Sequence, residues 1–215
     1  MREILDERML EIHEKLLKMS TMVEDNIGES INALMNQDVN LADEVIHSDY
    51  IINGYEQEIE NLCVKLVATQ TPVGSDLRKI FSVLKIVTDL ERIGDHCVNI
   101  SKVVCSLGKY KLVKPLVDLP QMAKVVKKMV INSINAFVDG DEVKAKEIAR
   151  IDDSVDDSYA KLYKELLNFL KEDFNEEEQI VGLLLVGRYL ERIADHATNI
   201  CERVIYMETG ESVRY

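Results

Sequence analysis

Two pairs of acidic residues stand four positions apart in nearly identical surroundings. Glu91 and Asp95 belong to the segment Glu-Arg-Ile-Gly-Asp-His, and Glu191 and Asp195 belong to Glu-Arg-Ile-Ala-Asp-His. Residues four apart share one face of a helix, where like charges repel by roughly 0.2–0.5 kcal/mol. Because the chain keeps such a pair twice, the pattern indicates a cation that compensates the repulsion, either an arginine or a metal ion.

A second set of carboxylates could complete each pair from a neighbouring helix. In the second half of the chain these are Asp152 and Asp156, and the equivalent positions of the first half hold Asp49 and Asn53. Four oxygen-bearing side chains form a hard-ligand site suited to Mg, Mn, Fe or Ca ions, and bridging carboxylates could hold more than one ion. Zinc fits less naturally, because the set contains no imidazole or thiolate.

The same carboxylates could instead form solvated helix faces with Arg92 and Arg192 as local partners, and spacing alone leaves both interpretations open. His96 and His196 lie about 100° around the helix from the adjacent aspartates and point away from the apolar stripe. We therefore expect these two histidines to be polar surface residues or partner contacts rather than metal ligands.

The acidic pairs belong to a longer internal repeat. Ser30-Ile31-Asn32-Ala33, followed by Asp38, recurs 103 residues later, whereas the segment Glu91–His96 recurs after 100 residues. The Pro- and Gly-containing stretch 69–75 is the natural place for the three-residue difference, because loops tolerate insertions. The chain therefore divides into repeats at 1–108 and 119–215, joined by a linker at 109–118 that contains Lys and Pro.

Apolar residues recur every three or four positions through each repeat, which predicts helices. Only 9 Gly, 3 Pro and no Trp occur in 215 residues, so many short strands are not expected. The expected helices span 3–36, 39–69, 76–106, 119–138, 142–171 and 176–208, with Asp38, Ser75, Asp118, Asp141 and Asn175 as N-caps. The predicted fold is all-α, with two tandem three-helix bundles related by the repeat.

Charge and hydropathy exclude several classes of protein. A net charge of −13 disfavours binding to nucleic acid or anionic membranes. The longest apolar run, Ile180–Gly187, is far shorter than the roughly 20 residues of a membrane span, and the first residues do not resemble a signal peptide. The four cysteines form no Cys-x-x-Cys pair and fit helical core positions. We expect a cytoplasmic protein without membrane insertion.

Together, these motifs resemble the PhoU family of phosphate-uptake regulators over nearly the whole chain. Supporting segments are Asn36-Gln37-Asp38 with Leu41-Ala42, Thr71-Pro72, Ser75-Asp76-Leu77-Arg78, Lys114-Pro115-Leu116 and Asp152–Tyr159. The resemblance implies a cytoplasmic protein, commonly a homodimer, that represses the phosphate-starvation response. Its implied role is an adaptor between the ATPase of a phosphate ABC transporter and a sensor histidine kinase.

The resemblance also implies multinuclear metal clusters, of iron or zinc, with Mn or Mg as further candidates. Carried over by position, one cluster would use Asp49, Asn53, Glu91 and Asp95, and the other Asp152, Asp156, Glu191 and Asp195. Asn53 departs from the acidic pattern. Because an amide is neutral, we expect the first site to bind metal more weakly than the second.

Catalysis is not expected from the sequence. A ferritin-like di-iron enzyme needs Glu-x-x-His, but Gly94 and Ala194 stand three residues after Glu91 and Glu191. The chain also has no Gly-rich phosphate loop or nucleophile motif. The alternative to an adaptor is a metal-storage or carboxylate-bridged metalloprotein without a signalling role, which would need the same helices and carboxylates.

Overall fold

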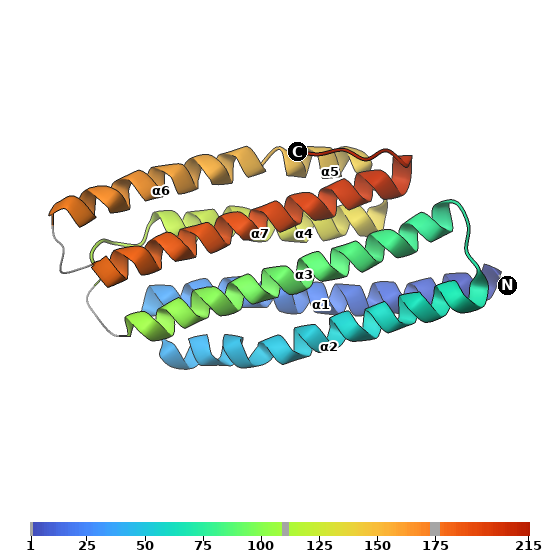
Figure 1. Cartoon of the computed structure of the whole chain (residues 1–215), viewed down its shortest axis with the longest axis horizontal. Helices are drawn as coiled ribbons and strands as arrows, with labels where there is room; N and C mark the ends of the chain where they lie inside the picture. The colour runs from blue at the N-terminus through green and yellow to red at the C-terminus, as the bar shows by residue number, and fades with distance from the viewer. Residues whose placement is uncertain (1, 109–111, 173–176) are drawn as a thin grey trace.

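The computed structural model describes residues 2–108, 112–172 and 177–215, and within these ranges it contains seven helices and no strand (Figure 1). The helices are α1 (Arg2–Asn36), α2 (Val39–Gln70), α3 (Ser75–Leu107), α4 (Asp118–Asp139), α5 (Glu142–Ala149), α6 (Asp152–Glu172) and α7 (Glu177–Thr209). The first three form one bundle and the last four form the other. The predicted all-α fold of two tandem bundles is confirmed.

The helix predicted at 142–171 is wrong in one respect, because it is interrupted after Ala149. The backbone N–H of Ile151 donates to Ile148 at 2.9 Å, and the carbonyl of Ile151 accepts from both the N–H and the hydroxyl of Ser154. Asp152 and Asp153 then occupy the first turn of α6, where carboxylates complement the positive end of a helix. In the first repeat, α2 continues through the equivalent residues.

Two of the predicted N-caps are confirmed. The carboxylates of Asp38 and Asp141 accept hydrogen bonds from backbone N–H groups in the first turns of α2 and α5. Ser75 and Asp118 were wrongly predicted as caps, because each is already the first helical residue and the residue before it makes no capping side-chain bond. Asn175 lies outside the described residues.

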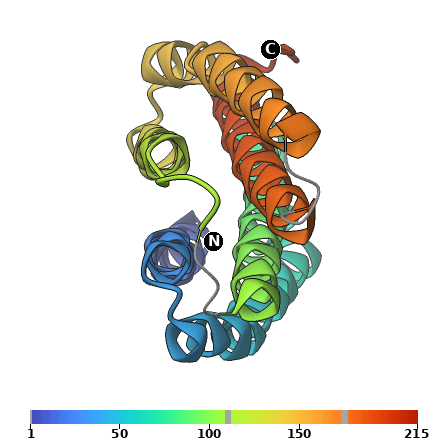
Figure 2. The same ribbon diagram turned by 90° about the vertical axis from the view of Figure 1, so that its left-hand side faces the viewer.

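Helices α3 and α7 run antiparallel and pack against each other, which joins the two bundles (Figure 1). Helices α1 and α2 pack on α3, helices α4, α5 and α6 pack on α7, and α1 also contacts α4 across the repeat boundary. Seen end-on, α3 and α7 form one wall, with α1 and α4 opposite (Figure 2). The core is continuous through both repeats. Three cysteines are buried in it as predicted, and Cys105 is partly buried.

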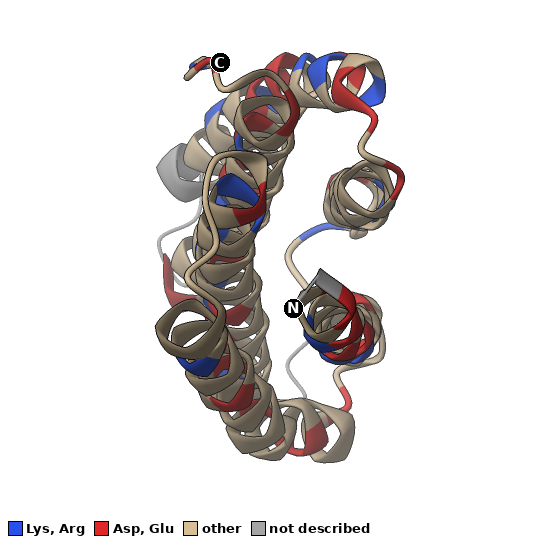
Figure 3. Cartoon of the chain, turned by 90° about the vertical axis from the view of Figure 1, so that its right-hand side faces the viewer, with Lys and Arg blue, Asp and Glu red and all other residues tan. Residues whose placement is uncertain are grey.

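The described part of the linker is tied to the second bundle by a buried lysine. The side chain of Lys114 is only 7% exposed, and its Nζ lies 2.7 Å from both Asp118 and Glu165. Residues 109–111 of the predicted linker lie outside the described residues. In the described ranges, no helix is long and apolar enough to cross a membrane. Acidic and basic residues are interspersed along the helices in the view of Figure 3.

Candidate metal centres

The first cluster consists of Asp49 and Asn53 on α2 and Glu91 and Asp95 on α3. Asn53 Nδ2 donates to Asp49 Oδ2 at 3.1 Å, which places both side chains on the same face of α2. That face meets α3 at Gly94, where an added Cβ would lie 3.2 Å from Ile52 and 3.8 Å from Asp49 Oδ1. The structure therefore brings the predicted residues of α2 up to those of α3.

Burial and mutual repulsion disfavour the charged forms in this cluster. Burial, followed by the charge of Asp95, raises the pKa of Glu91 to about 6. The same two causes raise the pKa of Asp49, against the hydrogen bond from Asn53 and the ammonium of Lys102. Asp49 Oδ1, Asn53 Oδ1 and Glu91 Oε2 are buried and have no hydrogen-bond partner among the described residues. Asp49 Oδ1 and Asn53 Oδ1 are therefore free to accept a cation, whereas Glu91 Oε2 already lies 3.3 Å from Arg92 Nε.

Glu56 also belongs to the first cluster, although the sequence analysis missed it. Burial and the charge of Glu60 raise its pKa, the charge of Asp95 adds to the increase, and Arg92 and Thr88 oppose it. Asn53 and Glu56 are three apart on α2, so the spacing signal was present. The internal repeat did not indicate Glu56, because the equivalent position of the second repeat holds Tyr159.

The second cluster consists of Asp152 and Asp156 on α6 and Glu191 and Asp195 on α7. Burial is the main cause that raises the pKa of Asp152 to about 6, and Asp195, Asp156 and Glu191 add to it in that order. Burial and then the charge of Asp195 also raise the pKa of Asp156 and of Glu191. Asp152 Oδ1 and Glu191 Oε2 are buried without a partner in the described part of the chain.

Arginines pair with both clusters, as one interpretation of the sequence expected. Arg92 contacts Glu91 at 3.3 Å and Asp95 at 3.1 Å, and Arg192 contacts Asp195 at 3.2 Å. The second cluster has an additional guanidinium, because Arg188 pairs with Glu191 where the first repeat has Thr88. These arginines neutralise part of the charge, but the buried oxygens Asp49 Oδ1, Asn53 Oδ1, Asp152 Oδ1 and Glu191 Oε2 remain without a partner in the described part of the chain.

The donor set fits a hard cation, although the side chains are not yet arranged around one. Each cluster contains four carboxylates, once Glu56 is included, together with buried oxygens that lack partners. Hard divalent ions prefer such oxygen ligands. In the ranges that the structure describes, no three His, Cys, Asp or Glu side chains form a ready coordination group. Binding would therefore require side-chain rotation away from the arginines.

The two histidines were wrongly expected at the surface. His96 and His196 meet between α3 and α7 with ring centroids 5.6 Å apart. His196 Nδ1 lies 2.9 Å from Asp89 Oδ1, which also accepts from Asn199, whereas His96 stacks on Tyr189. Burial and the neighbouring His196 lower the pKa of His96 to about 4. Helical periodicity predicts which face of a helix is buried within its own bundle. It does not predict the contact between α3 and α7 of the two bundles, where both histidines lie.

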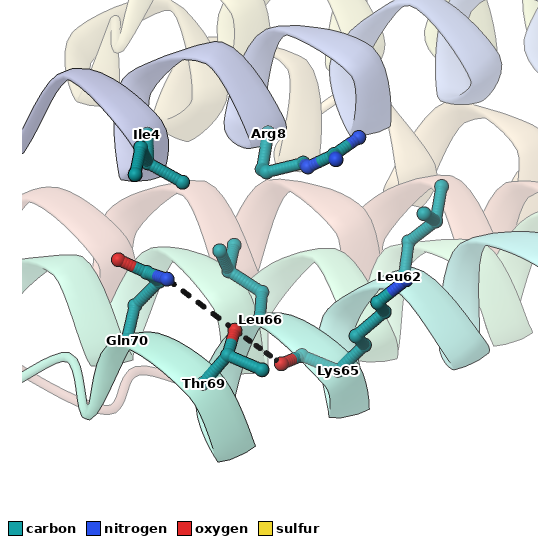
Figure 4. Close-up of a pocket in the computed structure, with 7 residues that line it drawn as sticks. All are labelled: Ile4, Arg8, Leu62, Lys65, Leu66, Thr69 and Gln70. Atoms are coloured by element: carbon teal, nitrogen blue, oxygen red, sulfur yellow. Dashed lines mark hydrogen bonds between the residues drawn. The ribbon is translucent and has the colours of Figure 1, made fainter. Parts of the chain in front are cut away.

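A separate groove lies between the beginning of α1 and the end of α2 (Figure 4). Its lining is mainly apolar, with two cations: Ile4, Arg8, Leu62, Lys65, Leu66, Thr69 and Gln70. Arg8 is paired with Glu11 at 2.7 Å, and Thr69 donates to the carbonyl of Lys65. Among the described residues, the lining of this groove contains no carboxylate, and none of the predicted cluster residues belongs to it.

An all-α chain of two repeats, each with an acidic cluster between its last helix and a neighbour, defines a class of helical repeat proteins. The PhoU domain family matches this chain at residues 16–104 and again at 119–204. The chain belongs to the PhoU family.

Relatives and solved structures agree over almost the full length. The chain is 42% identical to a protein of Clostridium acetobutylicum over 99% of this chain and 97% of that protein, and 38% identical to one of Aquifex aeolicus over 95% and 93%. Both relatives are called phosphate-specific transport system accessory protein PhoU homologs. Crystal structures of PhoU from Streptococcus pneumoniae and Pseudomonas aeruginosa match with TM-scores of 0.92 and 0.93 at 33% and 34% identity. The match with the Streptococcus pneumoniae structure covers 98% of this chain and 100% of that chain. The match with the Pseudomonas aeruginosa structure covers 96% of this chain and 99% of that chain.

Proposed function

We propose that this chain is a non-enzymatic accessory protein of phosphate-specific transport. The observation that carries the proposal is the similarity to transport accessory proteins across both repeats, at 42% identity over 99% of the chain for the relative from Clostridium acetobutylicum. The absence of the Glu-x-x-His pattern at Gly94 and Ala194 supports a role without catalysis.

In the proposed mechanism, the protein is a cytoplasmic adaptor between the ATPase of the phosphate ABC transporter and a sensor histidine kinase. It represses the phosphate-starvation response by binding more tightly to the repressing state of the kinase when the transporter has adequate phosphate. Its long helices offer faces for helix-on-helix docking, and a net charge of −13 complements basic patches on partners. We propose a homodimer as the working form.

We further propose that both clusters bind metal ions. Asp49, Asn53, Glu56, Glu91 and Asp95 would hold the first group of ions, and Asp152, Asp156, Glu191 and Asp195 the second. A bound cation would neutralise the repulsion between the carboxylates and connect α2 to α3 and α6 to α7. Iron or zinc is the family expectation, and the all-oxygen donor set favours iron, Mn or Mg over zinc.

The adaptor proposal is tested by affinity capture of the tagged protein from phosphate-replete and phosphate-starved lysates of its own host, read by mass spectrometry. We expect a phosphate-transporter ATPase or a sensor kinase, in amounts that change with phosphate. Charge reversal at the exposed Glu14 and Glu44 should reduce recovery, whereas Glu→Asp at both positions, the matched control, should not.

Recovery of neither partner under either condition would contradict the adaptor proposal. Metal that co-purifies in quantity in that case would favour the second candidate, a metal-storage or carboxylate-bridged metalloprotein without a signalling role. The observation that supports this second candidate is the presence of buried oxygens without partners in both clusters, among the described residues.

A further inference from the structure

Two arginines, Arg78 on α3 and Arg203 on α7, are partly buried and have no acidic partner. Neither makes an ion pair or a side-chain hydrogen bond with another residue that the structure describes. Their Nε atoms are buried, whereas their terminal Nη atoms are not. In a chain with a net charge of −13, four other arginines do pair with carboxylates: Arg8, Arg92, Arg188 and Arg192. The Nη atoms of Arg78 and Arg203 are therefore available to an anion.

The two arginines lie at the same end of the molecule, where α3 begins and α7 ends (Figure 1). Ser82 Oγ donates to the carbonyl of Arg203 at 3.4 Å, and Arg78 is one turn, about 6 Å along the axis, before Ser82. Gly210 has a left-handed backbone with φ +77° as the chain leaves α7, and an added Cβ there would lie 3.7 Å from Arg78 Cζ. Facing helices therefore hold the two guanidinium groups near each other.

An exposed aromatic ring and a third cation lie beside Arg78. Phe81 is 54% exposed, and Lys85 is exposed with no ion pair to a described residue. Positions three and seven after Arg78 share its side of the helix. We call Arg78, Phe81, Lys85 and Arg203 the arginine surface. Arginine and aromatic side chains are the residues that protein interfaces favour over the rest of a protein surface.

The internal repeat shows that packing of α3 on α7 does not require these cations. At the 100-residue offset, the opposite end of the helix pair holds the counterparts of the arginine surface: Glu178, Val181, Leu185 and Val103. An added Cβ on Gly182, the counterpart of Ser82, would lie 3.1 Å from Val103. The helices thus pack closely at that end with an aliphatic residue in place of Arg203. We infer that the cations at the other end serve an external contact.

We propose that the arginine surface docks an acidic segment of a protein partner, with carboxylates on Arg78 and Arg203 and an apolar side chain on Phe81. Guanidinium groups bind carboxylates through paired N–H donors. The net charge of −13 repels free anions at a distance, whereas a protein segment adds apolar contact with Phe81. The inference rests on the proposed adaptor role for the presence of a partner. It adds a cationic docking surface to a chain whose net charge favours basic partners.

The test uses photo-crosslinking in the host cell, with p-benzoylphenylalanine in place of Phe81. The matched control has the same replacement at Val181, the counterpart at the opposite end, which is 50% exposed. We expect position 81 to cross-link to a segment of another protein that contains at least two Asp or Glu residues, identified by mass spectrometry. The yield at position 181 should be at least about fivefold lower.

Charge reversal identifies the groups that bind the segment. Arg78→Glu with Arg203→Glu should lower the cross-link yield at position 81 about tenfold, because carboxylates then face carboxylates. Lys18→Glu with Lys128→Glu makes the same charge change at exposed positions of α1 and α4 and should leave the yield unchanged. Arg203→Val introduces the residue found at Val103. It should keep the thermal midpoint and lower the yield about threefold.

Four results would overturn the arginine surface. They are no excess of cross-links at position 81 over position 181, cross-links to a second copy of this chain, a cross-linked segment without Asp or Glu, and an undiminished yield in Arg78→Glu with Arg203→Glu. Calorimetric titration with inorganic phosphate should show no binding that this double variant removes. Such binding would assign the surface to a small oxyanion and overturn docking.

Affinity capture separates this proposal from the adaptor role. If the unchanged protein captures neither a transporter ATPase nor a sensor kinase, the adaptor proposal fails, while an acidic segment cross-linked at position 81 still supports the arginine surface. If the variant with Arg78→Glu and Arg203→Glu captures either partner in undiminished amount, the arginine surface fails and the adaptor proposal stands.

Discussion

In the first cluster, α2 runs without interruption past Asp49, whereas in the second the chain turns at Ile151 and Asp152 begins a new helix. A carboxylate in the first turn of a helix is stabilised by the positive end of the helix dipole, and one in the middle is not. The second repeat can therefore concentrate Asp152, Asp153, Asp156 and Asp157 in one segment. The first repeat spreads its acidic residues along α2.

The clusters also differ in what neutralises them. Arg92 and Lys102 act on the first, and Arg188 and Arg192 act on the second. The prediction that the first site binds metal more weakly counted Asn53 as a lost charge, but Glu56 adds a carboxylate to that cluster. The two clusters thus have similar net charge but different acidic side chains and different counterions.

The largest expected effect comes from the packing of α6 on α7. Gly187 stands where the first repeat has the buried Val87, and an added Cβ would lie 2.8 Å from Leu162 and 3.1 Å from Tyr159. We expect Gly187→Val to lower the free energy of unfolding by about 1–3 kcal/mol, because the added atoms push α6 away. Urea unfolding measures this change.

The first repeat offers a milder variant, Gly94→Ala, which introduces the residue found at Ala194. Its Cβ would lie 3.2 Å from the end of the Ile52 side chain, and alanine favours the helix by about 1 kcal/mol. We expect a change within about 1 kcal/mol. A loss of more than about 1 kcal/mol in Gly94→Ala would contradict this expectation.

The next largest effect is on metal affinity, at the position where the second cluster has Asp156 and the first has Asn53. Asp156→Asn gives the second cluster the amide found at Asn53, and we expect Mn²⁺ to bind there about tenfold more weakly because one carboxylate charge is lost. Asn53→Asp should strengthen the first cluster. Titration in a background of Glu91→Gln and Asp95→Asn isolates the second cluster, and unchanged affinity in Asp156→Asn would contradict the prediction.

The free energy of unfolding of the metal-free protein should depend on pH, because the carboxylates repel one another in both clusters. The pKa values of Glu91 and Asp152 rise to about 6 from ordinary values of 4.5 and 3.8, so the folded state holds more protons than the unfolded state in between. The free energy of unfolding should therefore fall as pH rises from about 4 to 7, by on the order of 1 kcal/mol per group after screening by solvent.

Urea unfolding in the presence of a chelator at pH 5 and pH 7.5 measures that dependence. Glu91→Gln should remove the part of the change in unfolding free energy that the titration of Glu91 causes. Added Mn²⁺ at pH 7.5 should restore the lost stability. An unfolding free energy that does not differ between Glu91→Gln and the unchanged protein at the two pH values would show that the cluster is already neutralised.

The smallest expected effect separates the counterions. Arg188→Thr gives the second cluster the Thr88 of the first and removes one guanidinium, so Mn²⁺ affinity should rise about two- to fivefold. Thr88→Arg should lower the affinity of the first cluster by a similar factor. A weaker second cluster in Arg188→Thr would mean that Arg188 positions Glu191 rather than competing with the cation.

The sequence by itself determined the repeat, the helical class, the caps at Asp38 and Asp141 and the acidic pairs, because these depend on local spacing and on residues within a few turns of each other. It also indicated that Asp49 and Asp152 would meet the pairs on the next helix, since the repeat presented the same arrangement twice. All eight predicted cluster residues lie at these two meeting points.

Only the tertiary structure decided the rest. The interruption at Ile151 depends on hydrogen bonds that compete closely with a continuous helix, and Glu56 joins its cluster through contacts that the second repeat lacks. His96 and His196 meet because two bundles pack along α3 and α7, and Tyr215 reaches Glu202 because the chain turns back after Gly210. Periodicity describes how one helix buries its own face. It does not predict the histidine contact, which joins residues 100 positions apart on two helices, or the Tyr215 contact, which needs a reversal of the chain direction.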